Sequence, residues 1–134
     1  MATILAHIRV EPGRERDFER IAGELFTESH EKDVGLRHYQ YWRGAESGLY
    51  YCLLAFDDFR AFLAHQTSPH HESASPRLGQ CVQDLRLEWV DPVPGASDLP
   101  PTEMQSLQDD VDDLTRRYHK LFRAKIQEWW SQGG

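Results

Sequence analysis

Positive charge is what this chain has too little of. Its 15 Lys and Arg residues face 22 Asp and Glu, which leaves a formal net charge of -7 over 134 residues. Nucleic acids and anionic membranes select proteins with an excess of Lys and Arg, so the composition argues against both as partners. The chain also lacks an apolar run long enough to cross a bilayer, and the start Met1-Ala2-Thr3 carries no signal-peptide pattern.

Cysteine is scarce as well. Cys52 and Cys81 are too few to build a disulfide framework, and such usage is typical of a reducing compartment. We therefore expect a cytoplasmic protein with free thiols. With 40% hydrophobic and 28% charged residues, the composition is that of one soluble domain with some chain left over.

The hydrophobic pattern predicts an α+β domain over residues 1–91. Apolar residues alternate along 3–10 and 85–90, which is the period of half-buried strands. The aromatic-rich stretch 36–43 and the apolar stretch 50–56 are predicted as two further strands, joined by a turn of hairpin length. Helical spacing covers about 14–32, and shorter helices are predicted at 59–65 and 69–81. The order β-α-β-β-α-β is the ferredoxin-like split βαβ, a four-stranded antiparallel sheet with helices on one face. The other face is rich in aromatics, so we expect a second copy to cover it as a homodimer.

The C-terminal part is predicted to be a separate unit. Residues 92–102 hold four prolines and form a stiff linker, and Thr102 with Gln105 fits a capping box. A helix over 103–131 would follow, with a coiled-coil seam of Leu107, Val111, Leu114, Tyr118 and Leu121. We expect this helix to dock across the dimer; the alternatives are that it folds back on its own domain or acts as an independent regulatory segment.

A histidine-rich bend separates the two short helices. Ser68-Pro69 is typical of a helix start, which places His65 at the end of one helix and His70 and His71 in the first turn of the next. With Glu72 these histidines supply enough ligands for a metal. We expect none, because neighbouring histidines point in different directions on a helix and no HExxH or CxxC spacing is present. His71 is expected in solvent.

With this order of elements in place, the chain resembles the antibiotic biosynthesis monooxygenase family of dimeric α+β barrels. The resemblance covers about residues 3–91 and leaves out the C-terminal part. Its matching segments are Val10-Glu11-Pro12-Gly13, Gly35 before an aromatic strand with Tyr39 and Arg43, Phe56-Asp57-Asp58-Phe59, and a stretch from His65 to His70 that is similar to the family's His-x-x-[Ser/Thr]-x-His.

The resemblance implies a range of activities. They include cofactor-free oxidation of quinols and polyketide phenols and oxygenative haem breakdown. Many relatives carry a glutamate near the end of the third strand where this chain has Leu54, and the haem-degrading branch uses an asparagine where this chain has Ala6. The second departure disfavours haem degradation.

Cofactor-free oxygenation needs a base, a hydrogen bond to the developing anion and a dry apolar pocket. His65 is the first candidate for the base, because histidine titrates near neutrality. His70 and Tyr39 are further catalytic candidates. Substrate contacts are expected from Arg37, Tyr41, Tyr51 and Trp42. Each candidate also has a purely structural explanation. The histidine can cap its helix, the aromatic residues can belong to the core or to an interface, and Arg37 can extend along the edge of the sheet.

Three functions follow from this reading. The first is a cofactor-independent monooxygenase that oxidises a quinol-like or polycyclic phenolic molecule, with O₂ as co-substrate and no other cofactor. The second is a non-catalytic ligand-binding or regulatory dimer on the same scaffold, favoured by Leu54 and the added C-terminal helix. The third, haem binding or degradation, is the least favoured.

Overall fold

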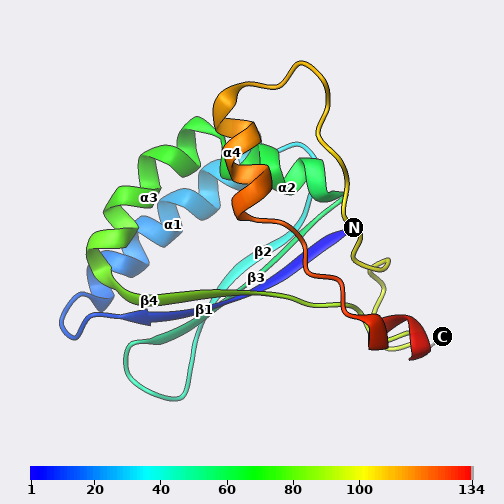
Figure 1. Ribbon diagram of the computed structural model, residues 1–134. Helices are drawn as coiled ribbons and strands as arrows, with labels where there is room; N and C mark the ends of the chain where they lie inside the picture. Colours follow the sequence, from blue (N-terminus) through cyan, green and yellow to red (C-terminus); the bar gives the residue numbers. More distant parts are fainter. Residues whose placement is uncertain (134) are drawn as a thin grey trace.

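The computed structural model describes residues 1–133, with side chains through Ser131, and forms a two-layer α+β fold (Figure 1). Its sheet consists of β1 (Ala2–Val10), β2 (Leu36–Arg43), β3 (Leu49–Phe56) and β4 (Val82–Trp89) in the order β2-β3-β1-β4, with every neighbouring pair antiparallel. The helices α1 (Glu15–Lys32), α2 (Phe59–Gln66) and α3 (Pro69–Cys81) cover one face. The predicted ferredoxin-like split βαβ is confirmed.

The helix-facing side of the sheet carries the hydrophobic core. Ile4, Ala6 and Ile8 alternate along β1 and are at most 5% exposed, and they pack with Phe18 and Leu25 of α1. This alternation follows from the period of two in a strand and of 3.6 in a helix, so each element buries one face. The core therefore lies between the sheet and the three helices.

A β-bulge changes the predicted face of Arg37. Leu36 pairs with Phe56 and His38 with Ala55, so Arg37 is one extra residue on β2. A bulge re-aims the side chain at its position. Arg37 consequently leaves the series of Tyr39 and Tyr41 and forms an exposed ion pair with Asp57 at 2.9 Å.

The opposite face of the sheet has no helix over it (Figure 1). His7, Tyr51 and Trp42 form one row across it in the strand register, and Trp42 is 57% exposed. No helix within residues 1–133 is long and apolar enough to cross a membrane.

The bend between α2 and α3 forms as predicted. The Asp58 carboxylate accepts a hydrogen bond from the Ala61 N–H and caps α2, and the Ser68 hydroxyl accepts one from the His71 N–H and caps α3. Pro69 takes the first helical position of α3, where a missing N–H costs nothing. The two caps fix the angle at which His65 and His70 meet.

The continuous helix predicted over 103–131 is wrong. Helix α4 covers only Asp113–Leu121, and a 3₁₀ helix follows at Glu128–Gly133. The capping box does not form, because Thr102 donates to the Val90 carbonyl and the Asp91 carboxylate, and the Gln105 side chain accepts from the Arg60 N–H at the start of α2. Thr102 and Gln105 are thereby bonded to the domain, and residues 102–111 form no helix before Asp112 caps α4.

Helix α4 packs on its own domain, beside α2 (Figure 1). The His119 ring contacts Phe59 edge-on at 5.5 Å between ring centroids, and Phe122 contacts Phe62 at 6.2 Å. The Tyr118 hydroxyl donates to the Glu72 carboxylate of α3 at 2.6 Å. In this single chain the C-terminal segment thus folds back on its own domain, rather than extending as a helix with the predicted seam, and Leu121 of that seam is 67% exposed.

Candidate functional site

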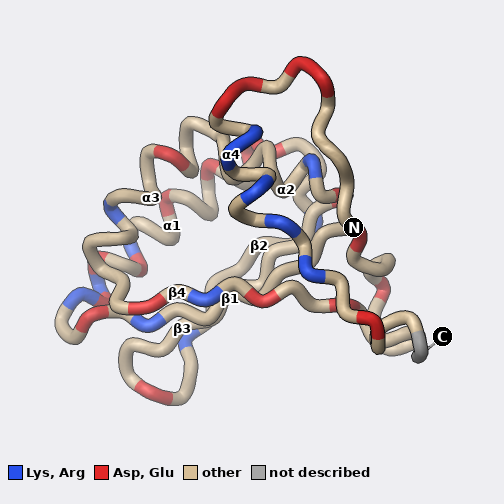
Figure 2. Tube along the Cα trace, in the orientation of Figure 1, with Lys and Arg blue, Asp and Glu red and all other residues tan. Residues whose placement is uncertain are grey.

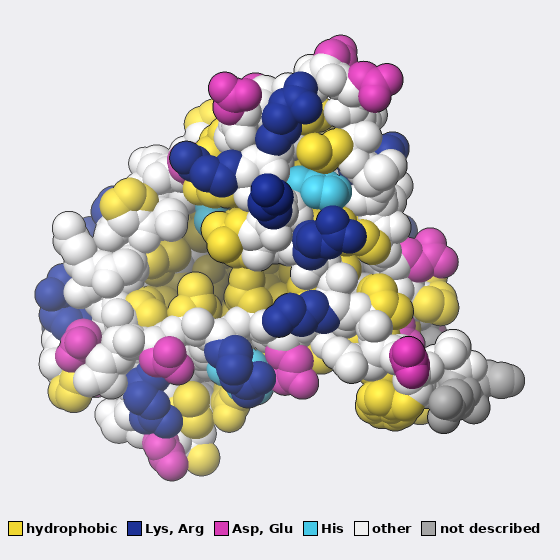
Figure 3. Space-filling model, viewed as in Figure 1, with side chains coloured by type: hydrophobic (Ala, Val, Ile, Leu, Met, Phe, Trp, Pro, Cys, Tyr) yellow, Lys and Arg dark blue, Asp and Glu magenta, His cyan; other side chains and the backbone are white. Residues whose placement is uncertain are grey.

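A cavity of about 450 Å³ lies between the inner face of the sheet and the helices. It opens on the side where α3, β4 and α4 meet, and Figure 3 shows there a hollow with a hydrophobic floor. Most of its wall is apolar, which suits an aromatic ligand more than a polar one. The apolar wall includes Ile4, Ala6, Leu54, Phe62, Leu78 and Leu87.

Two tyrosine hydroxyls meet at one side of this cavity. Tyr39 and Tyr41 are alternate residues on β2, so both face the helices, and their oxygens are 2.7 Å apart. Burial raises the pKa of Tyr39 and of Tyr41, and the nearby Cys52 thiol adds to the shift at Tyr41. Both phenols therefore stay protonated near neutral pH, and the pair can offer a proton to a ligand oxygen.

His65 is held by a carboxylate that the sequence did not single out. Its Nδ1 lies 2.5 Å from Oδ2 of Asp33, the residue directly after α1, and the His65 side chain is 1% exposed. The other oxygen, Oδ1, lies 2.7 Å from Nε2 of His70. One buried carboxylate thus bridges the imidazoles of α2 and α3.

The bridge depends on an ionised Asp33. Burial by itself raises the pKa of this carboxyl, but the hydrogen bond and charge of His65, joined by those of His70, outweigh it and hold the pKa below its usual range. With Asp33 accepting at Nδ1, the hydrogen of a neutral His65 is fixed on that nitrogen. Nε2 is then left as the acceptor nitrogen of a ring that lines the cavity.

His71 also lines the cavity, and the expectation that it lies in solvent is wrong. Its ring centroid is 5.0 Å from that of His65, and its Nδ1 is buried without a hydrogen-bond partner among the described residues. Burial, with the neighbouring His65, lowers the pKa of His71 to about 4. His71 is thus a neutral imidazole at physiological pH.

The structure separates the predicted site residues into two groups. His65, Tyr39 and Tyr41 line the cavity, and His70 joins them through Asp33. Tyr51 and Trp42 do not, because their places in the strand register put them on the open face of the sheet. Arg37 is also outside the cavity, paired with Asp57.

Sequence signals for the two missed residues differ in strength. His71 shares a helical stripe with Ala74, Leu78 and Cys81, so the spacing of α3 already favoured a place on the buried face. Asp33 gives no such signal, because 32 residues separate it from His65 and nothing local relates the two.

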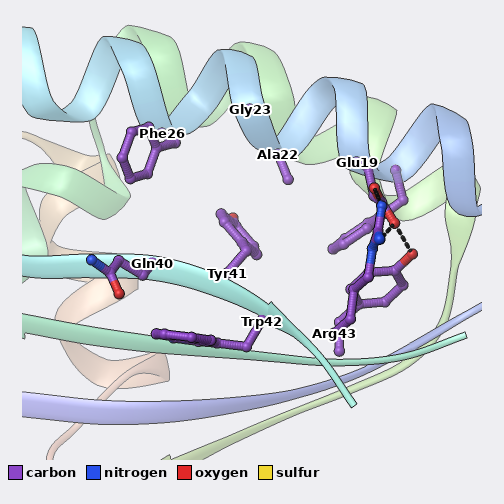
Figure 4. Close-up of a pocket in the computed structure, with 10 residues that line it drawn as sticks. Glu19, Ala22, Gly23, Phe26, Gln40, Tyr41, Trp42 and Arg43 are labelled. Atoms are coloured by element: carbon purple, nitrogen blue, oxygen red, sulfur yellow. Dashed lines mark hydrogen bonds and ion pairs between the residues drawn. The ribbon is translucent and has the colours of Figure 1, made fainter. Parts of the chain in front are cut away.

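A second hollow, of about 390 Å³, lies between α1 and the edge strand β2 (Figure 4). Tyr41 and Phe26 point into it, and Tyr41 also lines the cavity, so its ring separates the two spaces. At one end Glu19 accepts two hydrogen bonds from Arg43, at 2.6 and 3.0 Å, and one from Tyr50. Because Glu19, Arg43 and Tyr50 are bonded to one another, the rest of this hollow is an apolar groove.

Among the residues that the structure describes, Asp33, His65 and His70 form the group with metal-ligating chemistry. One ligand atom from each lies within 4.8 Å of the others. The two nitrogen-to-oxygen distances, 2.5 and 2.7 Å, are those of hydrogen bonds, and each nitrogen faces its own carboxylate oxygen. The geometry is therefore that of a hydrogen-bonded His-Asp-His bridge.

A family model described as antibiotic biosynthesis monooxygenase matches residues 1–77, which is more than half of the chain. The chain belongs to the antibiotic biosynthesis monooxygenase family. The match confirms the resemblance inferred from the sequence motifs, and it covers β1 to α3, the elements that hold Tyr39, Tyr41 and all three bend histidines.

Solved structures share the fold, and the first two given below are described as antibiotic biosynthesis monooxygenases. One from Caulobacter crescentus is 22% identical with a TM-score of 0.66, and the match covers 69% of this chain and 89% of that chain. One from Bacteroides thetaiotaomicron is 20% identical with a TM-score of 0.66, covering 78% and 95%. A Mycobacterium tuberculosis protein is 18% identical with a TM-score of 0.65, covering 72% and 98%. Comparison with curated protein sequences finds no match.

Proposed function

We propose that this protein is a cofactor-independent monooxygenase that oxidises a quinol-like or polycyclic phenolic molecule with O₂. The observation that carries the proposal is the apolar cavity, open at one mouth, into which two phenol hydroxyls and two histidines converge. Such a site binds a flat aromatic body through its walls and directs a few polar groups at the oxygen substituents. Membership of the monooxygenase family supports the same reaction class.

His65 is the proposed base. With Nδ1 anchored on Asp33, its Nε2 accepts the proton of a substrate hydroxyl, and the developing imidazolium is stabilised by the carboxylate. One hydroxyl of the Tyr39–Tyr41 pair donates to the other, and the remaining O–H donates to the phenolate oxygen, in a hydrogen bond that strengthens as negative charge builds up. His70 acts through Asp33 as a positioning residue, because it occupies the second carboxylate oxygen.

The electrons come from the substrate. Its electron-rich anion passes an electron to O₂ in the apolar cavity, and one oxygen atom then bonds to a ring carbon in place of its hydrogen. The O–O bond breaks, the other oxygen leaves as water with two hydrogens from the substrate, and the product is the oxidised quinone. No cofactor is required in this scheme, because the substrate itself supplies the reducing equivalents for the second oxygen atom.

Oxygen consumption by purified, chelator-treated protein tests the proposal, with hydroquinones and anthrone-type phenols as substrates. We expect His65→Ala to lower the turnover rate by about 10²–10⁴-fold, the usual contribution of a general base. Tyr39→Phe should lower it as well, while Tyr51→Phe serves as its matched control, since Tyr51 lies on the open face of the sheet. Uptake that is unchanged in His65→Ala and Tyr39→Phe removes both residues from the mechanism.

Asp33→Asn separates positioning from simple structure. The amide keeps the shape but takes away the charge that stabilises protonated His65, so we expect kcat to fall and the acidic limb of its pH profile to move, with little change in KM. A fall in kcat that comes with a loss of folding stability, while the pH profile of kcat stays unchanged, would assign Asp33 a structural role only.

A second function has one observation in its favour. Leu54 lines the cavity where many relatives carry a glutamate, so one carboxylate that could act as base or acceptor is missing. A non-catalytic ligand-binding dimer fits this loss. Tight binding of phenols without oxygen uptake across the whole panel would favour that function over the monooxygenase.

We also propose a homodimer and a cytoplasmic location. The helix-free face of the sheet presents the row of Trp42, Tyr51 and His7, which a second copy would cover. Cys52 and Cys81 are buried free thiols, which suits a reducing compartment. Sedimentation at micromolar concentration tests the dimer, and a species of 15.6 kDa, the mass of one chain, contradicts it.

A further inference from the structure

Basic residues are unevenly distributed in this acidic protein. Between Asp113 and Lys125 there are five Lys and Arg against a single acidic residue, although the whole chain has a net charge of -7. Figure 2 shows these cations along α4 and the segment that follows it. The five are Arg116, Arg117, Lys120, Arg123 and Lys125.

The cations of the domain are mostly neutralised, and those of the C-terminal segment are not. Eight of the ten Lys and Arg residues before α4 form ion pairs with carboxylates, as Arg43 does with Glu19 and Arg77 with Glu24. Within the part of the chain that the structure describes, none of the five C-terminal cations has such a pair, and Lys120, Arg123 and Lys125 are exposed. Their charge is therefore available to a ligand.

These free cations lie beside the mouth of the cavity. Phe122, between Lys120 and Arg123, is part of the cavity wall. In Figure 3 dark blue side chains gather along the margin of the hydrophobic hollow on the side of α4. The acidic group that lines the cavity, Asp84, lies on β4 and stands opposite Arg9 in the strand register. The α4 side of the mouth thus carries positive potential above an apolar interior.

We propose that the cavity takes an aromatic ligand with an anionic substituent. The rings occupy the apolar interior, and a carboxylate, sulfonate or phosphate group stays at the mouth among Lys120, Arg123 and Lys125. This inference rests on the proposed function only in taking the cavity as the ligand site. It adds a substrate class, and it makes the C-terminal segment, which lies outside residues 1–77 of the family match, a determinant of specificity.

Two interactions contribute to the recognition of such a ligand. Burial of the rings supplies affinity without regard to charge, whereas the exposed cations attract the anion over a range set by the ionic strength. A neutral analogue keeps the first interaction and loses the second. Binding of the anion should therefore be salt-dependent, and binding of the analogue should not.

Two fluorescent probes with the same rings test the proposal. 1-Anilinonaphthalene-8-sulfonate carries one negative charge, and N-phenyl-1-naphthylamine lacks the sulfonate. We expect the anion to bind about tenfold more tightly in low salt. That advantage should disappear near 1 M salt, where the Debye length is about 3 Å.

Variants locate the effect. Lys120→Gln with Arg123→Gln should remove the advantage of the anion and leave the neutral probe unchanged. Arg16→Gln with Arg20→Gln, on the exposed side of α1, makes the same change in net charge and should preserve it. Gly79→Phe should weaken both probes, because Gly79 lines the cavity and a Cβ added there meets no atom within 4 Å, so that the ring can occupy the space of the ligand.

Three results would overturn the proposal: equal affinity for the two probes, equal effects of the two charge variants, or no binding by either probe. These outcomes are independent of oxygen uptake. A protein that discriminates the probes but consumes no O₂ keeps the ligand class and loses the monooxygenase reaction. One that consumes O₂ with neutral phenols and ignores the sulfonate keeps the reaction and loses the anion site.

Discussion

The domain and the C-terminal segment of this chain are held in place by different means. The domain buries whole side chains such as Phe56, Phe59 and Phe62, each at most 1% exposed. Helix α4 has nine described residues and none is buried. The segment is held by half-buried rings, such as Phe122 on Phe62, and by hydrogen bonds such as that of Tyr118 to Glu72. Because apolar burial is the larger contribution to folding, the domain should set the global stability. The segment should instead open locally.

The largest expected effect is in the domain core. Phe62 contacts Phe56, Phe59 and Trp89 in edge-on or tilted ring pairs. Phe62→Ala should lower the free energy of unfolding by about 3–5 kcal/mol, because it removes buried area and leaves a cavity. Urea denaturation measures the loss. As the control from the C-terminal segment, Leu121→Ala should cost less than about 0.5 kcal/mol, since this side chain is 67% exposed.

An intermediate effect is expected from pH. The pKa of His71 is lowered from 6.5 to about 4 in the folded protein, so the unfolded chain binds the proton first as pH falls. The stability present above pH 6.5 is therefore lost between pH 6.5 and about 4, by up to about 3 kcal/mol. His71→Leu should flatten this part of the curve in urea midpoints measured from pH 7 to 4. A curve with the same slope in the variant would assign the pH dependence to other groups.

The smallest effect concerns the attachment of α4. Tyr118→Phe removes the 2.6 Å hydrogen bond to Glu72 and should cost about 1 kcal/mol. Hydrogen exchange is the informative measurement, because the amides of α4 should exchange faster while those of β1 stay unchanged. If β1 loses protection to the same extent, the segment and the domain unfold together and the contrast between them is wrong.

Local sequence patterns were enough to predict the strands and helices of the domain. The alternation in β1, the stripe of α1 and the Ser68-Pro69 start of α3 all appear as predicted. Such patterns failed after Thr102. A capping box is a local pattern, and here Thr102 donates to the Val90 carbonyl and the Asp91 carboxylate after β4, while the Gln105 side chain accepts from the Arg60 N–H of α2. A helix whose cap residues have better partners elsewhere in the fold starts later.

The candidate site was predictable in part for a related reason. His65 was found through the family motif, and the strand period put Tyr39 and Tyr41 on one face of the sheet, which the structure shows to be the face that lines the cavity. Arg37 was misplaced by one bulge residue, which no periodicity reveals. Tyr51 and Trp42 were assigned to the cavity for their chemistry alone, although their register puts them on the other face.

The sequence by itself determined the order of strands and helices, the family and the position of the histidine bend, because these depend on patterns within about ten neighbouring residues. Only the tertiary structure decided that Asp33 bridges His65 and His70, that His71 lines the cavity, and that the basic segment from α4 to Lys125 lies beside the mouth of the cavity. Each of these joins segments far apart in the chain. Such contacts are set by how the faces of packed elements meet, and no local pattern encodes them.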